Sequence, residues 1–505
     1  MPKTDSKSYK LDLSHLNRDG SVSITQQLVD LFTAAIESAE LDPGEKLPTT
    51  RALAAEAGVN HLTAARVYRR LAELGYVTAT VGRGTFVRSL VPAAAHEQGD
   101  DWQVWALPDR PLSYSEQVQE DAFRLATDVD TISLSTGWPS PRLYPTEELA
   151  RIAADVFREE GGEAISYLTA EGLPALREQI AARGRVKGFA SEPEEIIVTS
   201  GARQAIDLTA RALLEPGDVA VVESPTYAGF LSSLRATDAR VIGVPFDRDG
   251  LDVAALEKVL ARHEVKLCAL QTASQNPTGR DLSPERRERL AELARERNFF
   301  VVEDAVYSDL RFEGEPPRPL RELAPGHVIY IDSLSKTVGG GLRLGWIAAR
   351  GPVFDRLAAL KLATDFHTNT LSQHIAARYL ASGAYERQLA GTMPFYRERR
   401  DALLAALERH LTGEYRTERP RGGHNLWVQL TRPIDERTLY REAVRHGVTF
   451  IPGAAVTTER SPLTSLRLSF SLVDPEELDE GVRRLARAIR EVRRRDRYSA
   501  SVPVS

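Results

Sequence analysis

The stretch that decides the fold is "DSLSKTVGGGLRLGW", residues 332–346, in which Lys336 follows an apolar run and precedes three consecutive glycines. A lysine beside glycines is typical of a phosphate site. A P-loop, however, has its glycines before its lysine, in the order G-x-x-x-x-G-K-[ST]. Because Lys336 comes first, this is not a P-loop, and the function of the lysine has to follow from the segments around it.

Those segments predict an α/β domain over about residues 131–495. Apolar runs typical of strands alternate with helical patterns: "EEIIVTS", "VAVVES", "VKLCALQ", "FFVVEDAVY", "HVIYIDS" and "LRLGWIAA". This alternation favours a mostly parallel, mixed sheet covered by helices. We expect a small C-terminal α+β subdomain from about Gly391 and a flexible tail over residues 496–505.

Polar residues stand where the predicted strands end, the edge at which such sheets bind ligands. They are Ser200, Gly201, Ala202, Arg203, Tyr227, Asn276, Asp304, Tyr307, Ser333 and Lys336, with Arg343 following. Each alone has an ordinary explanation: "NPTG" at 276–279 is a good turn, and a lysine after a strand is usually solvated. Only their joint order predicts one site.

The joint pattern resembles the fold-type I aminotransferases, which use pyridoxal 5'-phosphate (PLP), over about residues 131–490. The resemblance implies that Lys336 forms the internal aldimine with the PLP aldehyde and moves the substrate proton. It also implies that Asp304 pairs with the pyridine nitrogen, that Asn276 and Tyr307 hydrogen-bond the phenolic oxygen, and that Tyr227 stacks on the ring.

For the phosphate, the resemblance implies a helix start with free N–H groups, together with a hydroxyl and a guanidinium. The residues concerned are Gly201, Ala202, Arg203, Ser333 and Arg343. The family often has Gln where Arg203 stands, which leaves the role of that side chain open.

Three further residues match the family's motifs. Tyr167, in "YLTAEGLPALR", matches the tyrosine that reaches the phosphate of the partner subunit, which implies a homodimer with shared sites. Arg467, in "LRLSFS", matches the arginine that binds a substrate carboxylate. Gly137, in "STGWP", is expected beside it, where a residue without Cβ allows close approach. An exposed strand arginine is the alternative for Arg467.

The N-terminal region, residues 21–88, predicts helix, helix, turn, helix and hairpin, the order of a winged helix-turn-helix. Apolar residues four apart mark the first helix, Thr49 or Thr50 can cap the second, and Gly58 ends it. We expect a flexible N-terminus over residues 1–20 and a linker over residues 89–130.

The region resembles the GntR-type winged helix-turn-helix through "PGEKLP" at 43–48, Arg51, Gly58 and "GTFV" at 84–87. The resemblance implies that Arg51 contacts a phosphate. It also implies that the start of the recognition helix lies near base edges and that the wing approaches the minor groove. The implied DNA-binding residues are Arg51, Asn60, His61, Thr63, Arg66, Arg83 and Gly84. The family usually has Arg at the position of His61, which leaves the base preference open.

Local charge agrees with DNA contact. Residues 46–88 hold seven basic and two acidic residues, whereas residues 21–45 hold five acidic residues and no Lys or Arg. The positive charge is thus confined to the recognition half, as a phosphate-facing surface requires. Ordinary solvated helix faces remain an alternative, because the whole chain carries a net charge of −6.

Composition limits the remaining possibilities. A chain of 505 residues predicts two or three folding units. Its single cysteine, Cys268, excludes an internal disulfide or cysteine metal cluster and fits a reducing cytosol, and we expect no metal. The polar N-terminus is not a signal peptide, and no apolar run approaches a membrane span, so we expect a cytoplasmic protein without membrane contact.

The two regions in one chain resemble the MocR-type transcriptional regulators. The resemblance implies a bacterial DNA-binding regulator whose aminotransferase-like domain senses PLP, an amino-compound effector, or both. It would bind an operator of repeated half-sites as a homodimer. A working aminotransferase with a secondary DNA-binding region is the alternative, because nothing in the sequence disables catalysis.

Overall fold

The chain divides into two compact units. The computed structural model describes residues 16, 23–37, 41, 44–80, 84–88, 112–190, 192–459 and 461–501. One unit combines residues 1–124, 434–445 and 488–505, and the other combines residues 125–433 and 446–487. Apart from Leu16, the predicted flexible N-terminus lies outside the described residues, as do residues 89–111 of the predicted linker and the end of the tail.

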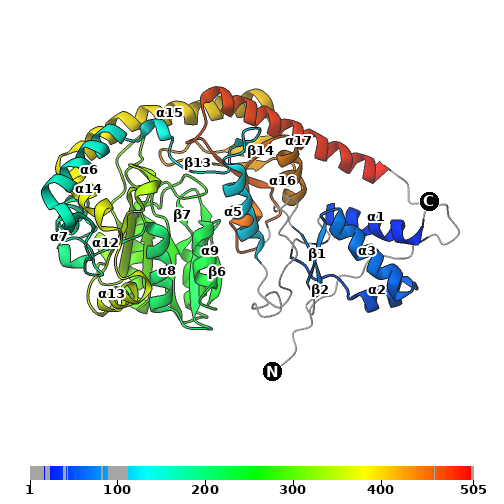
Figure 1. Cartoon of the computed structure of the whole chain (residues 1–505), viewed down its shortest axis with the longest axis horizontal. Coiled ribbons are helices and arrows are strands. Elements are labelled where there is room, and N and C mark those ends of the chain that lie inside the picture. Colours follow the sequence, from blue (N-terminus) through cyan, green and yellow to red (C-terminus); the bar gives the residue numbers. More distant parts are fainter. Residues whose placement is uncertain are drawn as a thin grey trace. The chain divides into compact units, whose positions relative to one another are not determined.

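The N-terminal region forms the predicted winged helix-turn-helix (Figure 1). Its elements are α1 (Ile24–Glu37), α2 (Thr50–Ala57), α3 (His61–Glu73), β1 (Val77–Thr80) and β2 (Gly84–Val87). The apolar stripe of α1 packs with residues of α2 and α3 in one buried cluster that includes Leu28, Phe32, Leu53, Val67 and Leu71. The Tyr68 hydroxyl donates to the Pro48 carbonyl oxygen at 2.6 Å and so ties α3 to the segment before α2.

Side-chain caps define where α2 and α3 begin. The Thr49 hydroxyl accepts a hydrogen bond from the Ala52 N–H at 3.1 Å, and the Asn60 carboxamide oxygen accepts one from the Thr63 N–H at 2.8 Å. Gly58 ends α2 at φ = +59°, a left-handed conformation that glycine adopts without steric penalty. The predicted cap at Thr49 and the predicted stop at Gly58 are therefore confirmed.

A mixed sheet of eight strands forms the centre of the second unit, in the order β4-β11-β10-β9-β8-β5-β6-β7. The run from β10 to β6 is parallel, whereas β11 lies antiparallel to both its neighbours and β7 lies antiparallel to β6. This confirms the predicted mostly parallel, mixed sheet. The strands are β4 (Ile196–Thr199), β5 (Val219–Ser224), β6 (Arg240–Asp247), β7 (Gly250–Leu251), β8 (Val265–Leu270), β9 (Phe300–Asp304), β10 (Val328–Ser333) and β11 (Gly345–Ala348).

Helices cover both faces of this sheet. Val221 and Val222 of β5 point to opposite faces and belong to two different buried clusters. One cluster contains residues of α8, α9 and α13, and the other contains residues of α10, α11 and α12. The helices of the unit are α6 (Thr146–Glu160), α7 (Pro174–Lys187), α8 (Ala202–Leu213), α9 (Ala228–Arg235), α10 (Val253–Leu260), α11 (Pro284–Arg297), α12 (Leu320–Leu323), α13 (Pro352–Asp365), α14 (Thr370–Ala381) and α15 (Ala384–Leu411).

A second, antiparallel sheet has the order β12-β13-β16-β15. Its strands are β12 (Tyr415–Thr417), β13 (Asn425–Leu430), β15 (Ile451–Pro452) and β16 (Ser465–Ser469), and β3 (Ile132–Ser133) pairs separately with β14 (Val448–Thr449). The subdomain boundary expected near Gly391 falls inside α15, which also contains Pro394. Gly391 and Pro394 suggest a break in the sequence, but burial of Tyr396 and Leu403 along α15 outweighs their low helix propensity.

Two predicted irregular segments contain helices. Helix α5 (Tyr114–Leu125) lies within the predicted linker, and α17 (Pro475–Ser501) continues past residue 496, where we expected a flexible tail. Before α5, the Ser113 hydroxyl and the Glu116 carboxylate form a capping box, a signal that the sequence does contain. The remaining helix is α16 (Glu436–Arg445). Among the described residues, no helix is long and apolar enough to cross a membrane.

Candidate functional site

Lys336 lies in a short 3-10 turn, Leu334–Lys336, directly after β10. Its amino nitrogen donates to the Gly137 carbonyl oxygen at 2.8 Å and lies 5.8 Å from the centroid of the Tyr307 ring. Burial lowers the pKa of Lys336, and the neighbouring Arg467 guanidinium lowers it further. A larger neutral fraction makes this amine a better nucleophile than a solvated lysine.

Asp304, at the end of β9, is buried and held by a glutamine that our sequence interpretation did not include. The Gln271 amide donates to a carboxylate oxygen of Asp304 at 2.7 Å, and the Gln271 side-chain oxygen accepts from the Asn276 N–H at 2.7 Å. Burial raises the pKa of Asp304 to about 6, although the Gln271 hydrogen bond and nearby Lys336 oppose the shift. Gln271 follows β8 directly, so the rule that points to strand ends could have found it.

Arg467 of β16 and Asn276 of the loop after β8 come together. An Arg467 terminal nitrogen donates to the Asn276 side-chain oxygen at 3.2 Å, and the other terminal nitrogen donates to the Ser135 carbonyl oxygen. Burial lowers the pKa of Arg467 to about 10, so the guanidinium is cationic at neutral pH. Its Nε has no hydrogen-bond partner among the described residues. The structure thus brings Arg467 beside Asn276 and excludes the exposed-strand alternative.

A second group forms a backbone cradle at the start of α8. Gly201 precedes this helix at φ = +86°, and a Cβ there would lie 2.9 Å from an Arg343 terminal nitrogen. Arg343 also donates to the Ser200 carbonyl oxygen at 2.8 Å. The first N–H groups of α8, including that of Ala202, have no acceptor within the helix. The Arg343 guanidinium thus lies next to a helix N-terminus, and both favour a phosphate group.

The remaining predicted phosphate and ring residues lie nearby with partners of their own. The Ser333 hydroxyl donates to the Leu344 carbonyl oxygen at 2.7 Å. The Arg203 guanidinium donates to the Ser232 hydroxyl at 2.8 Å and lies against Gly229 together with the Tyr227 ring. Tyr227, half-buried at the start of α9, is close enough to affect the pKa of Lys336.

Tyr167 differs from the other predicted cofactor residues because it lies on the surface of this chain. Its side chain is 87% exposed, and its ring packs edge-on against His367 at a centroid distance of 5.6 Å. The resemblance implies that Tyr167 reaches the phosphate of the partner subunit, and an exposed side chain is available for such a contact.

His424 and Asn425, which our sequence interpretation did not include, also lie beside Gly137. His424 is fully buried, with Nδ1 3.3 Å from the Gly137 carbonyl oxygen and its ring against those of Tyr307 and Tyr396. An ideal Cβ on Gly137 would lie 3.5 Å from the Asn425 side-chain oxygen. "GGHNLW" reads as a turn followed by a strand, and no property of the sequence alone directs these side chains to Lys336.

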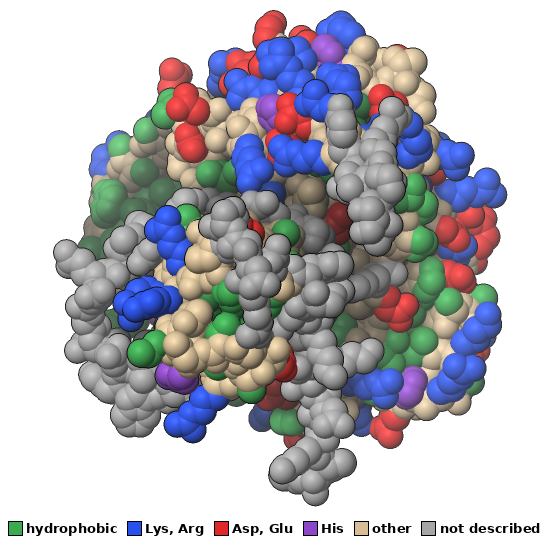
Figure 2. Space-filling view, turned by 90° about the vertical axis from the view of Figure 1, so that its right-hand side faces the viewer, with side chains coloured by type: hydrophobic (Ala, Val, Ile, Leu, Met, Phe, Trp, Pro, Cys, Tyr) green, Lys and Arg blue, Asp and Glu red, His purple; other side chains and the backbone are tan. Residues whose placement is uncertain are grey.

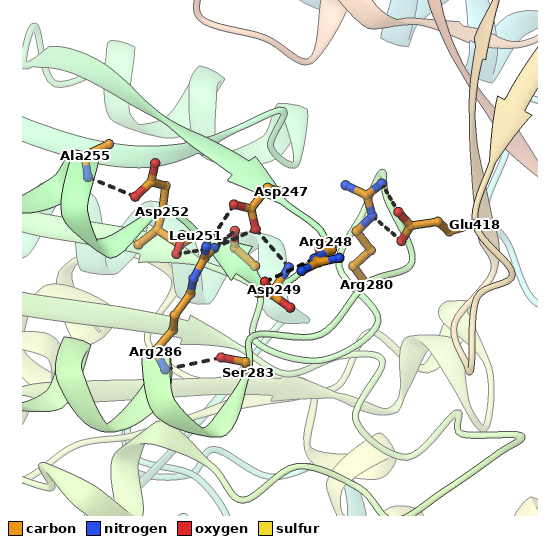
Figure 3. A network of polar contacts seen from close by, with 11 residues as sticks. Asp247, Arg248, Asp249, Leu251, Asp252, Ala255, Arg280, Ser283, Arg286 and Glu418 are labelled. Carbon is orange, nitrogen blue, oxygen red and sulfur yellow. Dashed lines mark hydrogen bonds and ion pairs between the residues drawn. The ribbon is translucent and has the colours of Figure 1, made fainter.

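Ion pairs hold the loop that carries Asn276. Figure 3 shows Arg280, four residues later, facing Glu418 from a separate segment, with two nitrogen–oxygen distances of 2.8 Å. In the same view Arg286, near the start of α11, makes a two-point contact with Asp247 at the end of β6. A cleft of about 710 Å³ runs along Arg280 and Glu418, but Lys336 does not line it. These contacts restrain the loop from outside the site.

The helix-turn-helix presents its predicted DNA-binding residues to solvent. Arg51, Asn60, His61 and Arg66 are exposed, Thr63 and Gly84 are partly buried, and Arg83 lies outside the described residues. The Asn60 oxygen is engaged in capping α3. On the face drawn in Figure 2, Lys and Arg side chains are interspersed with Asp and Glu, so this face carries no single large basic patch.

Comparisons with known proteins agree with this arrangement. Residues 129–485 match the family "Aminotransferase class I and II", and residues 24–87 match "Bacterial regulatory proteins, gntR family". The HTH-type transcriptional regulator YdcR of Escherichia coli K12 is 30% identical over 473 residues, which cover 92% of this chain and 99% of YdcR. The probable rhizopine catabolism regulatory protein MocR of Rhizobium meliloti is 28% identical over 477 residues, covering 94% of this chain and 95% of MocR.

Among solved structures, the α-aminoadipate aminotransferase LysN of Thermus thermophilus, complexed with N-(5'-phosphopyridoxyl)-L-leucine, superposes with a TM-score of 0.68. It is 34% identical, and the match covers 76% of this chain and 100% of LysN. The large domain therefore has the fold of the fold-type I aminotransferases. The chain belongs to the aminotransferase class I and II family and, with its GntR-type reader, to the MocR-type DNA-binding transcriptional regulators.

The cofactor of this domain is PLP, and the residues present fit it. A buried amine of lowered pKa, a buried carboxylate and a guanidinium next to a helix N-terminus match its aldehyde, its ring nitrogen and its phosphate. The Arg467 Nε and the Asn425 carboxamide have no hydrogen-bond partner among the described residues, so a bound group can complete their hydrogen bonds.

Proposed function

We propose that this chain is a cytoplasmic, homodimeric regulator that holds PLP at Lys336 and changes its DNA binding when an amino compound enters the same site. The observation that carries the proposal is the meeting of Lys336, Asp304, Asn276 and Arg467 in a protein that also carries a DNA reader. The ligand can shift the dimer between two arrangements only if it binds them with different affinity.

Each residue has a proposed part in holding the cofactor, which supplies an aldehyde and an electron-withdrawing ring. Lys336 binds the aldehyde, Asp304 keeps the ring nitrogen protonated, and Asn276 with Tyr307 orients the phenolic oxygen. Tyr227 covers the ring. The phosphate lies on the start of α8, held by Gly201, Ala202, Arg203, Ser333 and Arg343. Arg467 and Gly137 receive a carboxylate of the effector.

A homodimer with shared sites is supported by an exposed apolar patch that includes Ile165, Tyr167, Leu362 and Phe366. The two segments that carry these residues adjoin, because the Thr370 hydroxyl donates to the Ser166 carbonyl oxygen at 2.7 Å and the Tyr167 ring touches His367. Large exposed apolar side chains in one place are typical of a protein interface. A partner chain covering this patch could receive Tyr167 at its own phosphate.

Two DNA readers in one dimer predict an operator of two half-sites. In each reader Arg51 and Arg66 would contact phosphates, and His61 and Thr63, at the start of α3, would lie near base edges. The wing, with Arg83 and Gly84, would approach the minor groove. The exposed positions of Arg51 and His61 support this assignment.

An active aminotransferase is the second candidate, because every residue that the resemblance requires for catalysis is present and LysN is an aminotransferase. The DNA reader favours the regulator. Product detection with amino acid and keto acid pairs decides between them: we expect turnover far below the ~1 to 10³ per second of ordinary enzymes. Turnover in that range would establish the enzyme.

One experiment tests both halves of the regulator. Lys336→Ala should abolish the visible absorption that PLP-loaded protein shows, and Arg51→Ala should weaken binding to the protein's own promoter in gel shifts at fixed salt. Lys258→Ala, which removes a surface lysine of α10, is the control for both. An unchanged spectrum in Lys336→Ala would refute the role of Lys336 in binding PLP. An unchanged DNA affinity in Arg51→Ala would refute the proposed contact between Arg51 and a DNA phosphate.

A further inference from the structure

The antiparallel sheet presents a polar face next to Lys336. Asn425 of β13 pairs with Ser469 of β16, and Trp427 pairs with Arg467. Because side chains alternate along a strand, these four side chains share one face. Asn425 therefore lies on the same side of the sheet as the arginine that we assign to the effector's carboxylate, diagonally across from it.

The Asn425 carboxamide is buried without a partner. Its side chain is 1% exposed, and neither the amide nitrogen nor the oxygen has a hydrogen-bond partner among the described residues. Burial raises the pKa of the nearby Tyr307 hydroxyl, and the Asn425 amide opposes that shift, but the geometry between the two groups is not that of a hydrogen bond. Ser469, opposite, differs because its hydroxyl donates to the His424 carbonyl oxygen at 3.1 Å. A buried carboxamide without hydrogen bonds is unfavourable, so native proteins keep one where a ligand or water completes it.

The carboxamide borders the space beside Gly137. A Cβ on Gly137 would lie 3.5 Å from the Asn425 oxygen, 3.6 Å from the Tyr307 hydroxyl oxygen and 3.9 Å from the Ser469 hydroxyl oxygen. These are ordinary contact distances, so a methyl group fits at this position without strain and the Asn425 carboxamide lies within contact range of it. Gly137 also receives the Lys336 amine on its carbonyl oxygen, which places the space beside the reactive nitrogen.

His424 fixes the chain next to Asn425. Its ring lies 5.5 Å from that of Tyr307 and 4.6 Å from that of Tyr396, measured between centroids. Burial lowers the pKa of His424 to about 3, so the ring is neutral, and its Nδ1 proton can bond the Gly137 carbonyl oxygen. The neutral His424 ring thus holds the chain next to Asn425 in place without adding a charge to the site, so the Asn425 carboxamide is already positioned before a ligand binds.

The open donors define the ligand. The Arg467 guanidinium has no carboxylate partner among the described residues, and its buried Nε–H is unpaired. The Asn425 amide supplies a second unpaired donor on the same face. A cation with one open N–H and a neighbouring amide N–H match the two oxygens of a carboxylate.

We propose, on the basis of the function proposed above, that Asn425 is a positioning residue for the effector. Its amide holds the second oxygen of the carboxylate that Arg467 binds. The carboxylate contact of Arg467 belongs to the proposed function, and the new element is Asn425: an amino acid depends on its amide, whereas a simple amine of the same shape does not.

The test compares each amino acid with the amine that lacks only its carboxylate: L-alanine with ethylamine, and L-phenylalanine with phenethylamine. Binding to the PLP-loaded full chain is measured by spectral titration and by calorimetry. Asn425→Leu should weaken amino acid binding about tenfold, the loss of one charge-assisted hydrogen bond. Asn425→Asp should weaken it further because the new carboxylate repels the ligand. Asn425→Leu, which adds no charge, should leave the amine affinity and the absorption of bound PLP unchanged.

Gln429→Leu, a change from amide to leucine farther along β13, is the matched control and should bind both ligands as the unmodified protein does. The proposal is overturned if Asn425→Leu binds the amino acid as tightly as the unmodified protein, or if it loses amine and amino acid affinity equally. It is also overturned if the unmodified protein binds the amine as tightly as the amino acid. Failure of the unmodified protein to retain PLP would instead overturn the proposed function and this inference with it.

Discussion

At the scale of single residues, the site is set by buried groups whose pKa values are displaced in opposite directions. Burial raises the pKa of Asp304 to about 6 and lowers that of Lys336, so the carboxyl and the amine are each moved toward their neutral forms. Gln271 holds Asp304 in place by a 2.7 Å hydrogen bond. A cationic ring nitrogen beside Asp304 would restore its charge, so cofactor binding and the protonation of Asp304 are linked.

This linkage predicts a pH effect on the PLP-free protein. The pKa of Asp304 rises from 3.8 to about 6 on folding, so the folded state binds more protons between these values. Stability should therefore fall as pH rises from about 4 to about 6, by up to about 3 kcal/mol. Thermal melts across this range should show the slope in unmodified protein and in the Asp355→Asn control, whose carboxylate is exposed on α13. Asp304→Asn should lack it, and a slope that survives in that variant contradicts the assignment.

At the scale of elements, the recognition helix shows how one residue can serve two requirements. Asn60 matches the family's base-reading positions, yet its side-chain oxygen accepts the Thr63 N–H at 2.8 Å and begins α3. The cap orients the first turn, where His61 and Thr63 lie. If α3 is the DNA-reading helix, as we propose, DNA affinity should depend on Asn60 through the helix start, whether or not its amide also contacts a base.

Asn60→Ala should weaken the start of α3 by about 1 kcal/mol, because alanine offers no acceptor to the N3 amide. Hydrogen exchange measured by mass spectrometry should show faster exchange over residues 61–68, and gel shifts should show weaker DNA binding. Asn60→Ser keeps a capping oxygen and should retain both protection and most of the affinity. If Asn60→Ser binds DNA as poorly as Asn60→Ala while α3 stays protected, the amide contacts a base directly and the capping account is insufficient.

At the scale of the whole molecule, the sequence allowed us to predict features that depend on the order of local motifs. It did not allow us to predict features that depend on packing between distant segments. Strand ends and motif order predicted the sheet and the positions of Lys336 and Asp304, because those signals are local. The sequence did not show that α15 passes through Gly391, because burial of its side chains outweighs propensity. Nor did it show that Asn425 reaches Gly137, because that contact joins segments far apart in the chain and depends on strand register.

The proposed homodimer can be tested at the exposed patch that we assign to its interface. If the patch of Ile165, Tyr167, Leu362 and Phe366 is the dimer interface, then Phe366→Glu places a charge where an apolar surface must be buried. Sedimentation velocity should show a dimer for the unmodified protein and a monomer for this variant, with a dissociation constant raised on the order of a hundredfold. Val129→Glu, which alters a fully exposed valine outside the patch, should remain dimeric.

The same variant separates the two shared functions of the dimer. Monomers cannot supply Tyr167 to a partner's phosphate, so PLP affinity should fall together with the dimer population. They also cannot hold two readers at one operator, so binding to a paired half-site should drop to that of a single half-site, because the gain in effective concentration is lost. A Phe366→Glu protein that is monomeric yet keeps full PLP and operator affinity would show that neither site is shared between subunits.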